Sequence, residues 1–241
     1  MKQALGVIPA RYHSHRFPGK PLALILGKPM IQRVYEGALS SKSLSRLIIA
    51  TDDKRIQKVC HDFGAEVWMT SPHHHSGTER VAEVAEKISA PIVINIQGDE
   101  PLIRGEIIDD LVTTLEDDSI PMATAAVRVK DFDDIKRENT VKVVFDQKGF
   151  ALYFSRSPLP FQARDFFHQH IGIYGYQRDF LLQFCSLPPS RLEKAEKLEQ
   201  LRALENGFRI KVIESPHFTL SVDSPQDIIR MENQLRMREN E

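Results

Sequence analysis

Cysteine is scarce in this chain of 241 residues, which contains only Cys60 and Cys185. The two lie far apart and form no metal-binding spacing, so the sequence offers neither a disulfide framework nor a cysteine zinc site. We expect two reduced thiols in a cytoplasmic protein. The sequence also lacks an apolar run of 18 residues, and its first residues have a strand-like pattern. We therefore expect neither a membrane helix nor a signal peptide.

The chain has no excess of charge of either sign, because 32 basic residues face 33 acidic ones. This balance argues against a general nucleic-acid binder, although phosphate contacts could still be local. Two nucleotide motifs are missing as well. No G-x-G-x-x-G occurs, so a Rossmann dinucleotide site has no support. The segment before Gly19-Lys20 is not a Walker A loop, because no glycine lies five residues before Gly19 and Pro21 follows Lys20.

What remains is an ordinary globular composition, with 41% hydrophobic and 27% charged residues, and we expect one domain with a large core. Short apolar runs alternate with segments of helical periodicity as far as residue 129. This order predicts an α/β fold with a mostly parallel central sheet and flanking crossover helices. The predicted strands are at residues 5–8, 47–50, 67–69, 92–96 and 122–129, and the predicted helices are at 29–43, 55–63, 77–88 and 106–115.

The pattern changes after residue 129. Two β-rich segments, 141–145 and 150–154, flank a turn with Gly149 and predict a hairpin. Together with a strand at 168–176, they form a β-rich insertion at about 130–176 within the single domain, of the kind that often serves as a substrate lid or an oligomer arm. The remaining predicted elements are helices at 178–185 and 191–205, a strand at 210–213 and a C-terminal helix after residue 224.

A basic loop follows the first strand. It carries Arg11, Arg16 and Lys20 around Pro18 and Gly19. Glycine lets the backbone approach a ligand closely, and a basic loop between a strand and a helix is a natural phosphate seat in an α/β fold. A solvated basic loop would have the same local sequence, so both interpretations stay open on these residues alone.

Carboxylates follow the most apolar strand, residues 92–96, which we expect to be central in the sheet. Asp99 and Glu100 come directly after it, and Gly98 leaves room beside them. Such a pair suits a hard divalent cation such as Mg²⁺. A capped turn is the alternative, and we prefer the metal because the first loop already implies phosphates.

Several polar groups have simple structural interpretations. Asp52 or Asp53 is expected to cap the helix that follows. The triplet His73–His75 is expected to be a solvent loop and not a metal site, because adjacent side chains point in different directions and no second ligand cluster supports them. In the segment S-G-T-E-R that follows, Ser76 or Thr78 can cap a helix and place its N–H donors beside a cation.

Polar residues in the second half of the chain also have simple structural interpretations. His170 and Tyr174 fall on the same side of their strand, as polar groups of a half-buried strand would. Most charges of the helix at 191–205 would be solvated, so Glu199 and Gln200 carry little information by composition. Asp223 or Ser224 has the position of a cap for the C-terminal helix.

Six motifs stand in order along the chain: S-G-T-E-R, Q-G-D-E-P, Y-F-S-R, H-I-G-I-Y-G-Y, L-E-Q-L-R and V-D-S-P. Together with the basic loop, they closely resemble the 3-deoxy-manno-octulosonate (Kdo) cytidylyltransferases of lipopolysaccharide synthesis. The resemblance runs from Val7 to the C-terminal helix. The basic loop is shared among sugar nucleotidyltransferases, whereas S-G-T-E-R, H-I-G-I-Y-G-Y and L-E-Q-L-R are more particular to the Kdo enzymes.

The resemblance implies a Rossmann-like nucleotidyltransferase fold and a cytoplasmic homodimer. It implies that CTP and Kdo are joined, with Mg²⁺, to give CMP-Kdo and pyrophosphate. A cytidylyltransferase for another 2-keto acid sugar, such as 8-amino-Kdo or a sialic acid, is the close alternative. A non-catalytic nucleotide-binding protein of the same fold is the alternative from another class.

The resemblance also implies roles for residues. The nucleotide would contact Arg11, Arg16, Lys20, Arg80 and Gln97, with Arg11, Lys20 and Asp99 as the catalytic groups. The sugar would contact Gln97, Arg156, His170, Tyr174, Glu199 and Gln200. Mg²⁺ would bind Asp99 and Asp223, and the assignment of Asp223 rests on the resemblance alone. The β-rich insertion at about 130–176 would serve dimerisation and sugar binding, with the hairpin at 142–154 at the dimer interface.

Overall fold

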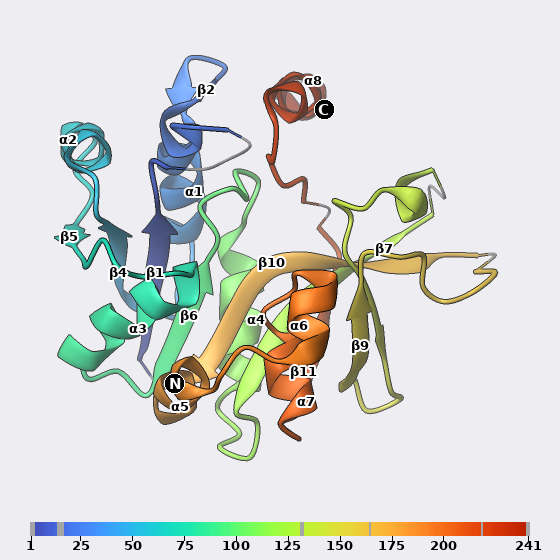
Figure 1. Cartoon of the computed structure of the whole chain (residues 1–241). Coiled ribbons are helices and arrows are strands. Elements are labelled where there is room, and N and C mark those ends of the chain that lie inside the picture. The colour runs from blue at the N-terminus through green and yellow to red at the C-terminus, as the bar shows by residue number, and fades with distance from the viewer. Residues whose placement is uncertain (1–2, 14–16, 131–132, 164, 218, 240–241) are drawn as a thin grey trace.

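A nine-stranded sheet runs through the computed structural model, which describes residues 3–13, 17–130, 133–163, 165–217 and 219–239 (Figure 1). Its main path, from one edge to the other, is β11 (Ile210–Ser215), β7 (Met122–Val129), β10 (Phe167–Gln177), β6 (Ile92–Ile96), β1 (Ala4–Ala10), β4 (Leu44–Thr51) and β5 (Val67–Met69). The strand at 92–96 is therefore central, as its apolar sequence predicted.

The main path is parallel except at one strand. β1 pairs in parallel with β4 and β6, β4 with β5, and β7 with β11. β10 is antiparallel to both of its neighbours, β6 and β7. The predicted mostly parallel α/β sheet is confirmed, and the carboxyl ends of β1, β6, β7 and β11 all point to the same edge of the sheet.

Helices cover both faces of the sheet because successive strand residues point to opposite sides. Ile49 packs on the side of α1 (Met30–Leu39), α2 (Lys54–Asp62) and α4 (Gly105–Thr114). Its neighbour Ile48 packs on the side of α3 (Gly77–Lys87) and α5 (Arg178–Ser186). Two buried apolar layers result, which explains why the strands are apolar on both faces.

The predicted helix caps form. The Asp53 carboxylate accepts a hydrogen bond from the Arg55 backbone N–H at 2.8 Å and begins α2. The Ser76 hydroxyl accepts one from the Glu79 N–H at 3.1 Å and begins α3. Each cap satisfies an N–H that the first helical turn leaves without a partner.

The predicted hairpin also forms, from β8 (Lys142–Phe145) and β9 (Ala151–Ser155). Asp146 accepts hydrogen bonds from the N–H groups of Lys148 and Phe150, and Gly149 has the positive φ of 75° that the turn needs. β8 pairs with β10, which joins the hairpin to the main sheet (Figure 1).

The single helix predicted at 191–205 is wrong. The structure has two short helices, α6 (Arg191–Glu196) and α7 (Leu201–Glu205). Lys197 takes the left-handed conformation between them, at φ 55° and ψ 46°. The Glu196 carbonyl accepts from Arg156 Nε at 2.9 Å, and Leu198 is buried. Contacts with distant residues thus end α6 where the local sequence would have continued it.

The remaining elements surround the carboxyl edge of the sheet. They are the single-turn helices η1 (Lys20–Leu22) and η2 (Asp134–Lys136), the small pair β2 (Leu24–Ile25) and β3 (Lys28–Pro29), and α8 (Pro225–Glu239). α8 faces β2 across this edge (Figure 1), and Glu232 accepts a 2.8 Å hydrogen bond from the Leu26 N–H. Among the described residues, no helix is long and apolar enough to cross a membrane.

Candidate active site

The loops that follow β1 and β6 enclose a cavity of about 440 Å³. Because both strands are parallel and adjacent, their following loops meet at the carboxyl edge, where ligands of open α/β sheets bind. The Cβ of any residue replacing Gly98 would lie 3.2 Å from the Pro9 carbonyl oxygen, so glycine allows the two loops to approach. The lining includes Arg11, His13, Lys20, Gly77, Gln97, Gly98, Asp99 and Asp223.

Lys20 lies between two carboxylates. Its Nζ is 2.6 Å from Asp99 Oδ2 and 3.5 Å from Asp223 Oδ1. Burial alone would lower the pKa of Lys20, but Asp99 and Asp223 together raise it above its ordinary value, so the ammonium group stays charged. The Val222 N–H also donates to the Asp99 carbonyl at 2.9 Å, which joins the two carboxylate segments through the backbone.

Asp227 shapes the turn that presents Asp223. Its Oδ2 accepts hydrogen bonds from the N–H groups of Asp223 at 3.1 Å and Ser224 at 2.8 Å, and from the Ser224 hydroxyl at 2.8 Å. The sequence suggested that Asp223 or Ser224 would cap the last helix. In the structure, the carboxylate of Asp227, in the first turn of α8 (Pro225–Glu239), reaches back to the N–H groups of both residues.

The donor set suits Mg²⁺. Asp99 and Asp223 reach the same cation, Lys20, so their oxygens converge on one small volume. No group of three or more His, Cys, Asp or Glu side chains among the described residues could hold a metal ion. Mg²⁺ commonly uses one or two carboxylates, with waters and substrate phosphates completing its shell. A sparse, two-carboxylate site beside a cavity that is also lined by Arg11 therefore fits this ion.

The histidine triplet is connected to Arg11. Arg11 Nη1 donates to the His75 carbonyl at 3.1 Å, and the His75 N–H donates to Glu79 Oε2 at 2.7 Å. His74 Nε2 lies 2.7 Å from Glu83, while His73 and His75 are exposed. The triplet thus belongs to a loop whose backbone orients Arg11. Arg16, which the sequence also predicted to contact the nucleotide, lies outside the described residues.

Arg80, the fourth cation predicted to contact the nucleotide, is fully buried. Its guanidinium donates to the Thr70 hydroxyl and, at 3.0 Å, to Asp52 Oδ2. It does not line the cavity of about 440 Å³. A contact with the nucleotide stays a prediction, and it would require the guanidinium to leave these protein partners.

A second cavity, of about 270 Å³, adjoins the first, because Gln97, Asp99 and Asp223 line both. The five remaining residues predicted for the sugar all line this second cavity, which we call the sugar cavity. They are Arg156, His170, Tyr174, Glu199 and Gln200. They come from β10 and from the segments that follow β9 and α6, so only the fold brings them together.

His170 is neutral in this cavity. Burial lowers its pKa to about 3, and its Nε2 lies 2.9 Å from the Thr124 hydroxyl. That hydroxyl gives its one proton to the Ile173 carbonyl at 2.7 Å, so it must accept from His170. His170 therefore carries its proton on Nε2, which leaves Nδ1 as a hydrogen-bond acceptor.

A chain of side chains connects the two cavities. Gln97 Nε2 donates to Asn95 at 3.0 Å, and Asn95 donates to Thr78 at 3.3 Å. The Thr78 hydroxyl in turn donates to Glu199, whose pKa burial raises. Gln200 is 3% exposed, and its Nε2 has no hydrogen-bond partner among the described protein atoms. A buried amide donor without a partner is costly, so a ligand in the sugar cavity would supply what it lacks.

Backbone carbonyl groups hold the Arg156 guanidinium in place. Its Nε and Nη1 donate to the carbonyls of Glu196 and Glu138 at 2.9 and 2.8 Å. The fully buried Lys142 donates to the carbonyl of Arg156 itself and, at 2.5 Å, to that of Thr140. Burial lowers the pKa of Lys142 to about 8. Sequence reasoning assigned no role to Lys142, since nothing local marks a lysine as buried.

A family model described as "Cytidylyltransferase" matches residues 5–212 of the chain. The chain belongs to the cytidylyltransferase family. Among its relatives, the 3-deoxy-manno-octulosonate cytidylyltransferase of Syntrophotalea carbinolica is 50% identical, over 95% of this chain and 97% of the relative. The enzyme of the same name from Geobacter sulfurreducens is 47% identical, over 95% and 98%.

A solved structure agrees with this family assignment, and a second one shows the same fold. A structure of CMP:2-keto-3-deoxy-manno-octonic acid synthetase complexed with CTP has a TM-score of 0.91 and 41% identity, and the match covers 98% of this chain and 99% of that one. A 4-diphosphocytidyl-2C-methyl-D-erythritol synthase from Anaerococcus prevotii matches over 98% and 96% with a TM-score of 0.65. It shares 12% identity and therefore shows the fold alone.

The acidic pair of this cytidylyltransferase, Asp99 and Glu100, is split by the fold. Asp99 faces Lys20, whereas Glu100 is 4% exposed and accepts a 3.3 Å hydrogen bond from the Gly172 N–H. Thr219 lies near the carboxyl and acts to lower its pKa, but Glu100 Oε2 makes no hydrogen bond of normal geometry with the described residues. Burial, reinforced by Asp99, raises the pKa of Glu100 to about 8, so this side chain is neutral at pH 7.

Proposed function

We propose that the protein transfers CMP from CTP to the anomeric 2-hydroxyl of Kdo, giving CMP-Kdo and pyrophosphate in an Mg²⁺-dependent reaction. The observation that carries this proposal is the meeting of the two cavities at Asp99 and Asp223, beside Lys20. A nucleotide in one cavity and a sugar in the other would place their reacting atoms at the same charged cluster. The names of the relatives support the choice of CTP and Kdo.

Phosphoryl transfer asks a protein mainly for positioning and charge stabilisation. Arg11 and Lys20 would neutralise the triphosphate and the departing pyrophosphate, and Arg16 belongs to the same loop. Mg²⁺ held by Asp99 and Asp223 would supply positive charge at the phosphate oxygens and help to lower the pKa of the attacking hydroxyl. Gln97, which lines both cavities, would position nucleotide and sugar relative to one another.

The sugar cavity offers complementary groups to a 2-keto acid sugar. The Arg156 guanidinium is the natural partner of a carboxylate. His170 Nδ1 can accept a hydrogen bond from a sugar hydroxyl, Gln200 Nε2 can donate one, and the Glu199 carboxylate can accept one. Tyr174 lies against His170, with ring centroids 5.3 Å apart, and would close the wall of the cavity.

We further propose that the whole chain is one cytidylyltransferase domain that forms homodimers through its β-rich insertion, at about 130–176. Leu152 in β9 is 63% exposed and Phe161 is 86% exposed, an unusual loss of apolar burial in a lone chain. A cytoplasmic location agrees with the free thiols of Cys60 and Cys185.

The test is a coupled pyrophosphate-release assay with CTP, Mg²⁺ and a panel of Kdo, 8-amino-Kdo and sialic acid. We expect turnover with Kdo and loss of turnover when Mg²⁺ is chelated. Asp99→Ala should lower the rate by about 10²–10³-fold, as for other preorganised electrostatic groups. Asp62→Ala, an exposed acid at the end of α2, is the matched control and should behave as wild type.

The outcomes separate the alternatives. Undiminished Mg²⁺-dependent turnover in Asp99→Ala would contradict the metal assignment. Faster turnover with 8-amino-Kdo or sialic acid would transfer the proposal to that sugar. CTP binding without turnover on any sugar of the panel would favour a non-catalytic nucleotide-binding protein.

A further inference from the structure

The buried ammonium group of Lys142 lies outside both proposed substrate cavities. Lys142 begins β8 and is fully buried, whereas proteins almost never bury a lysine completely unless it is paired. Its Nζ donates to three backbone carbonyls: those of Arg137 at 3.1 Å, Thr140 at 2.5 Å and Arg156. An ammonium group has three N–H donors and no acceptor, so these three carbonyls satisfy it.

The three carbonyls belong to two segments of the β-rich insertion. Arg137 and Thr140 follow η2, whereas Arg156 follows β9. The register of β8 and β9 sets Lys142 opposite Ser155, which brings the next residue, Arg156, beside the ammonium group. Lys142 therefore ties the segment that follows η2 to the segment that follows β9.

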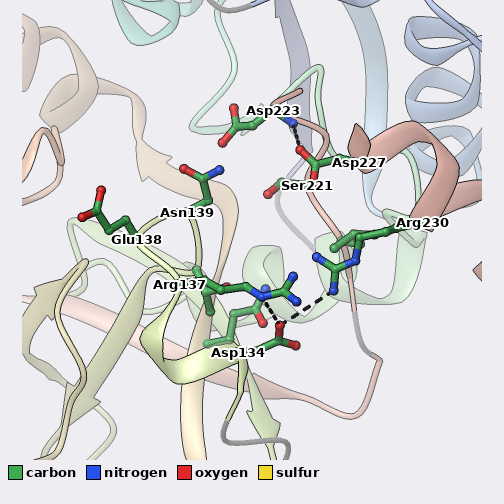
Figure 2. Close-up of a pocket in the computed structure, with 11 residues that line it drawn as sticks. Asp134, Arg137, Glu138, Asn139, Ser221, Asp223, Asp227 and Arg230 are labelled. Atoms are coloured by element: carbon green, nitrogen blue, oxygen red, sulfur yellow. Dashed lines mark hydrogen bonds and ion pairs between the residues drawn. The ribbon is translucent and has the colours of Figure 1, made fainter. Parts of the chain in front are cut away.

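The segment that follows η2 contacts Lys142 and Arg156 through carbonyl groups. Figure 2 shows the Arg137 guanidinium directed toward Asp134, with Nε 3.0 Å from Asp134 Oδ1, and the Glu138 carboxylate directed away from both. The carbonyl of Arg137 accepts from Lys142, and that of Glu138 accepts from Arg156 Nη1 at 2.8 Å. The backbone of this one segment thus holds both cations.

These contacts surround the group that would bind the carboxylate of the sugar acid. The Arg156 N–H donates to Glu196 Oε2 at 2.9 Å, and the Arg156 carbonyl accepts from Lys142. Val141, which precedes Lys142, lines the sugar cavity, and its carbonyl accepts from the His170 N–H at 2.8 Å. The ammonium group therefore lies directly behind residues that face the sugar.

The ammonium group is costly in this position. Burial lowers the pKa of Lys142 to about 8, and Arg156 acts in the same direction, while Glu196 and Glu138 oppose the shift. Methionine would avoid the desolvation cost, but it would leave three carbonyls without their donor. A charged donor also forms stronger hydrogen bonds than a neutral one, so it holds the carbonyls more firmly.

We propose that Lys142 is a positioning residue for the sugar acid, which ties the backbone of Arg156 to the segment that follows η2 and so fixes the guanidinium for the substrate's carboxylate. This inference rests on the proposed function and adds a residue to it. Loss of the ammonium group should weaken the use of the sugar acid more than that of CTP. It should have little effect once the Arg156 side chain is absent.

The experiment is a double-mutant cycle of pyrophosphate release, with KM measured separately for CTP and for Kdo. The proteins are the wild type, Lys142→Met, Arg156→Ala and the variant that combines the two substitutions. Lys148→Met is the matched control, because it removes an exposed lysine from the turn of the same hairpin. Thermal unfolding of every variant is measured in parallel.

We expect Lys142→Met to lower kcat/KM for Kdo on the order of 10–100-fold through a higher KM for Kdo, as when a substrate-holding group is slightly misplaced. The KM for CTP should hardly change, and Lys148→Met should behave as wild type. In the Arg156→Ala background, Lys142→Met should lower kcat/KM by no more than about twofold, which is the precision of such a cycle.

Lys142→Arg gives a second test, because a guanidinium group keeps its charge throughout the pH range of the assay. In the wild type, Lys142 loses its charge above about pH 8. Its hydrogen bonds then become neutral ones, so kcat/KM for Kdo should fall about fivefold between pH 7 and about pH 9.5. Lys142→Arg should lack this fall. Glu100, whose pKa is also about 8, titrates in both proteins and cancels in the comparison.

An equal rise in both KM values, or an unchanged kcat/KM for Kdo in Lys142→Met, would overturn the proposal. A full further loss in the combined variant would overturn it as well. If Lys142→Met does not fold, the pH comparison decides, and the same alkaline fall in the wild type and in Lys142→Arg would contradict the positioning role. If the wild type used no sugar acid with CTP, the proposed function itself would have failed, so the two failures are distinguishable.

Discussion

Burial decides the protonation of His170 in the sugar cavity. Its ring is 9% exposed and packs against Phe154 and Tyr174, and its Nε2 proton goes to Thr124. A charged imidazolium would lose its hydration there, so the pKa falls to about 3. The consequence is a fixed hydrogen-bond pattern at pH values well above 3, with Nδ1 as an acceptor.

The first prediction concerns the pH dependence of stability. The unfolded chain protonates His170 below about pH 6.5, whereas the folded chain does so only near pH 3. The contribution of neutral His170 to the free energy of unfolding is therefore complete above pH 6.5. It is lost as the pH falls toward 3, at up to about 1.4 kcal/mol per pH unit. Between pH 6.5 and 5, the free energy of unfolding of His170→Gln should therefore fall by about 1–2 kcal/mol less than that of the wild type.

Urea unfolding of both proteins at these two pH values checks this. Glu100, whose raised pKa acts in the opposite direction between pH 8 and 4.5, contributes equally to both proteins and cancels in the comparison. Parallel pH profiles would show that His170 titrates normally in the folded protein.

The second prediction concerns Asp227, which acts through Asp223. Asp227→Ala removes the acceptor of three hydrogen bonds that hold the Asp223–Ser224 turn. We expect metal affinity in the presence of CTP to fall about 10–100-fold, as when other outer partners of metal ligands are lost. Titration with Mn²⁺, followed by the electron paramagnetic resonance of the free ion, measures it. Asp227→Asn keeps an acceptor and should restore most of the affinity; equal weakening in both variants would contradict a positioning role.

At the scale of elements, the break between α6 and α7 builds one wall of the sugar cavity. A continuous helix would keep Glu199 and Gln200 on its regular surface. The left-handed turn at Lys197 lets Leu198 bury and directs Glu199 and Gln200 into the cavity. Glu193 completes a capping box with Ser190 at the start of α6. Its carboxylate also accepts from Arg202 Nε of α7 at 2.8 Å, so both helices are held on either side of the break.

The third prediction tests this turn. A side chain in the left-handed region costs about 1 kcal/mol relative to glycine. Lys197→Gly should raise the free energy of unfolding by about 0.5–1 kcal/mol, and Lys197→Val should lower it by about 1 kcal/mol or more, in urea unfolding. Lys197→Val should also raise the KM for sugar more than that for CTP. A glycine variant less stable than wild type would contradict the assigned conformation.

At the scale of the whole molecule, strand direction assembles the site. β1, β6, β7 and β11 are parallel, so the loops that follow them open at one edge. These loops carry Arg11, Asp99, Asn139 and Asp223, and most of the chain lies between the first and the last of these residues. α8 and β2 cover this edge from opposite ends of the sequence, with Ile25, Met30, Val222 and Met231 in a shared apolar cluster.

The fourth prediction concerns assembly. If the insertion forms the dimer, Leu152→Glu combined with Phe161→Glu should produce monomers, because each introduces a charge into an apolar contact. Light scattering after size-exclusion chromatography gives the mass. The exposed apolar residue Leu24 in β2 provides the control, and Leu24→Glu should leave the dimer intact. A double variant that remains dimeric would place the interface elsewhere.

The sequence by itself determined most of the elements and the family. The predicted bounds of β5, β6 and β7 match the structure, and Asp53 and Ser76 cap their helices as expected. These features depend on alternation of apolar residues and on side-chain to backbone hydrogen bonds within a few residues. Such interactions are local, so the order of residues along the chain is sufficient to reveal them.

Only the tertiary structure decided how the site is composed. It brought Asp223 to Lys20, turned Glu100 away from Asp99, enclosed Arg80 beside Asp52 and broke the predicted helix at Lys197. Each result depends on a contact between segments that are distant in sequence, or on burial that no local pattern encodes. Desolvation and strand direction are properties of the folded chain, and they determined which of the candidate polar side chains meet.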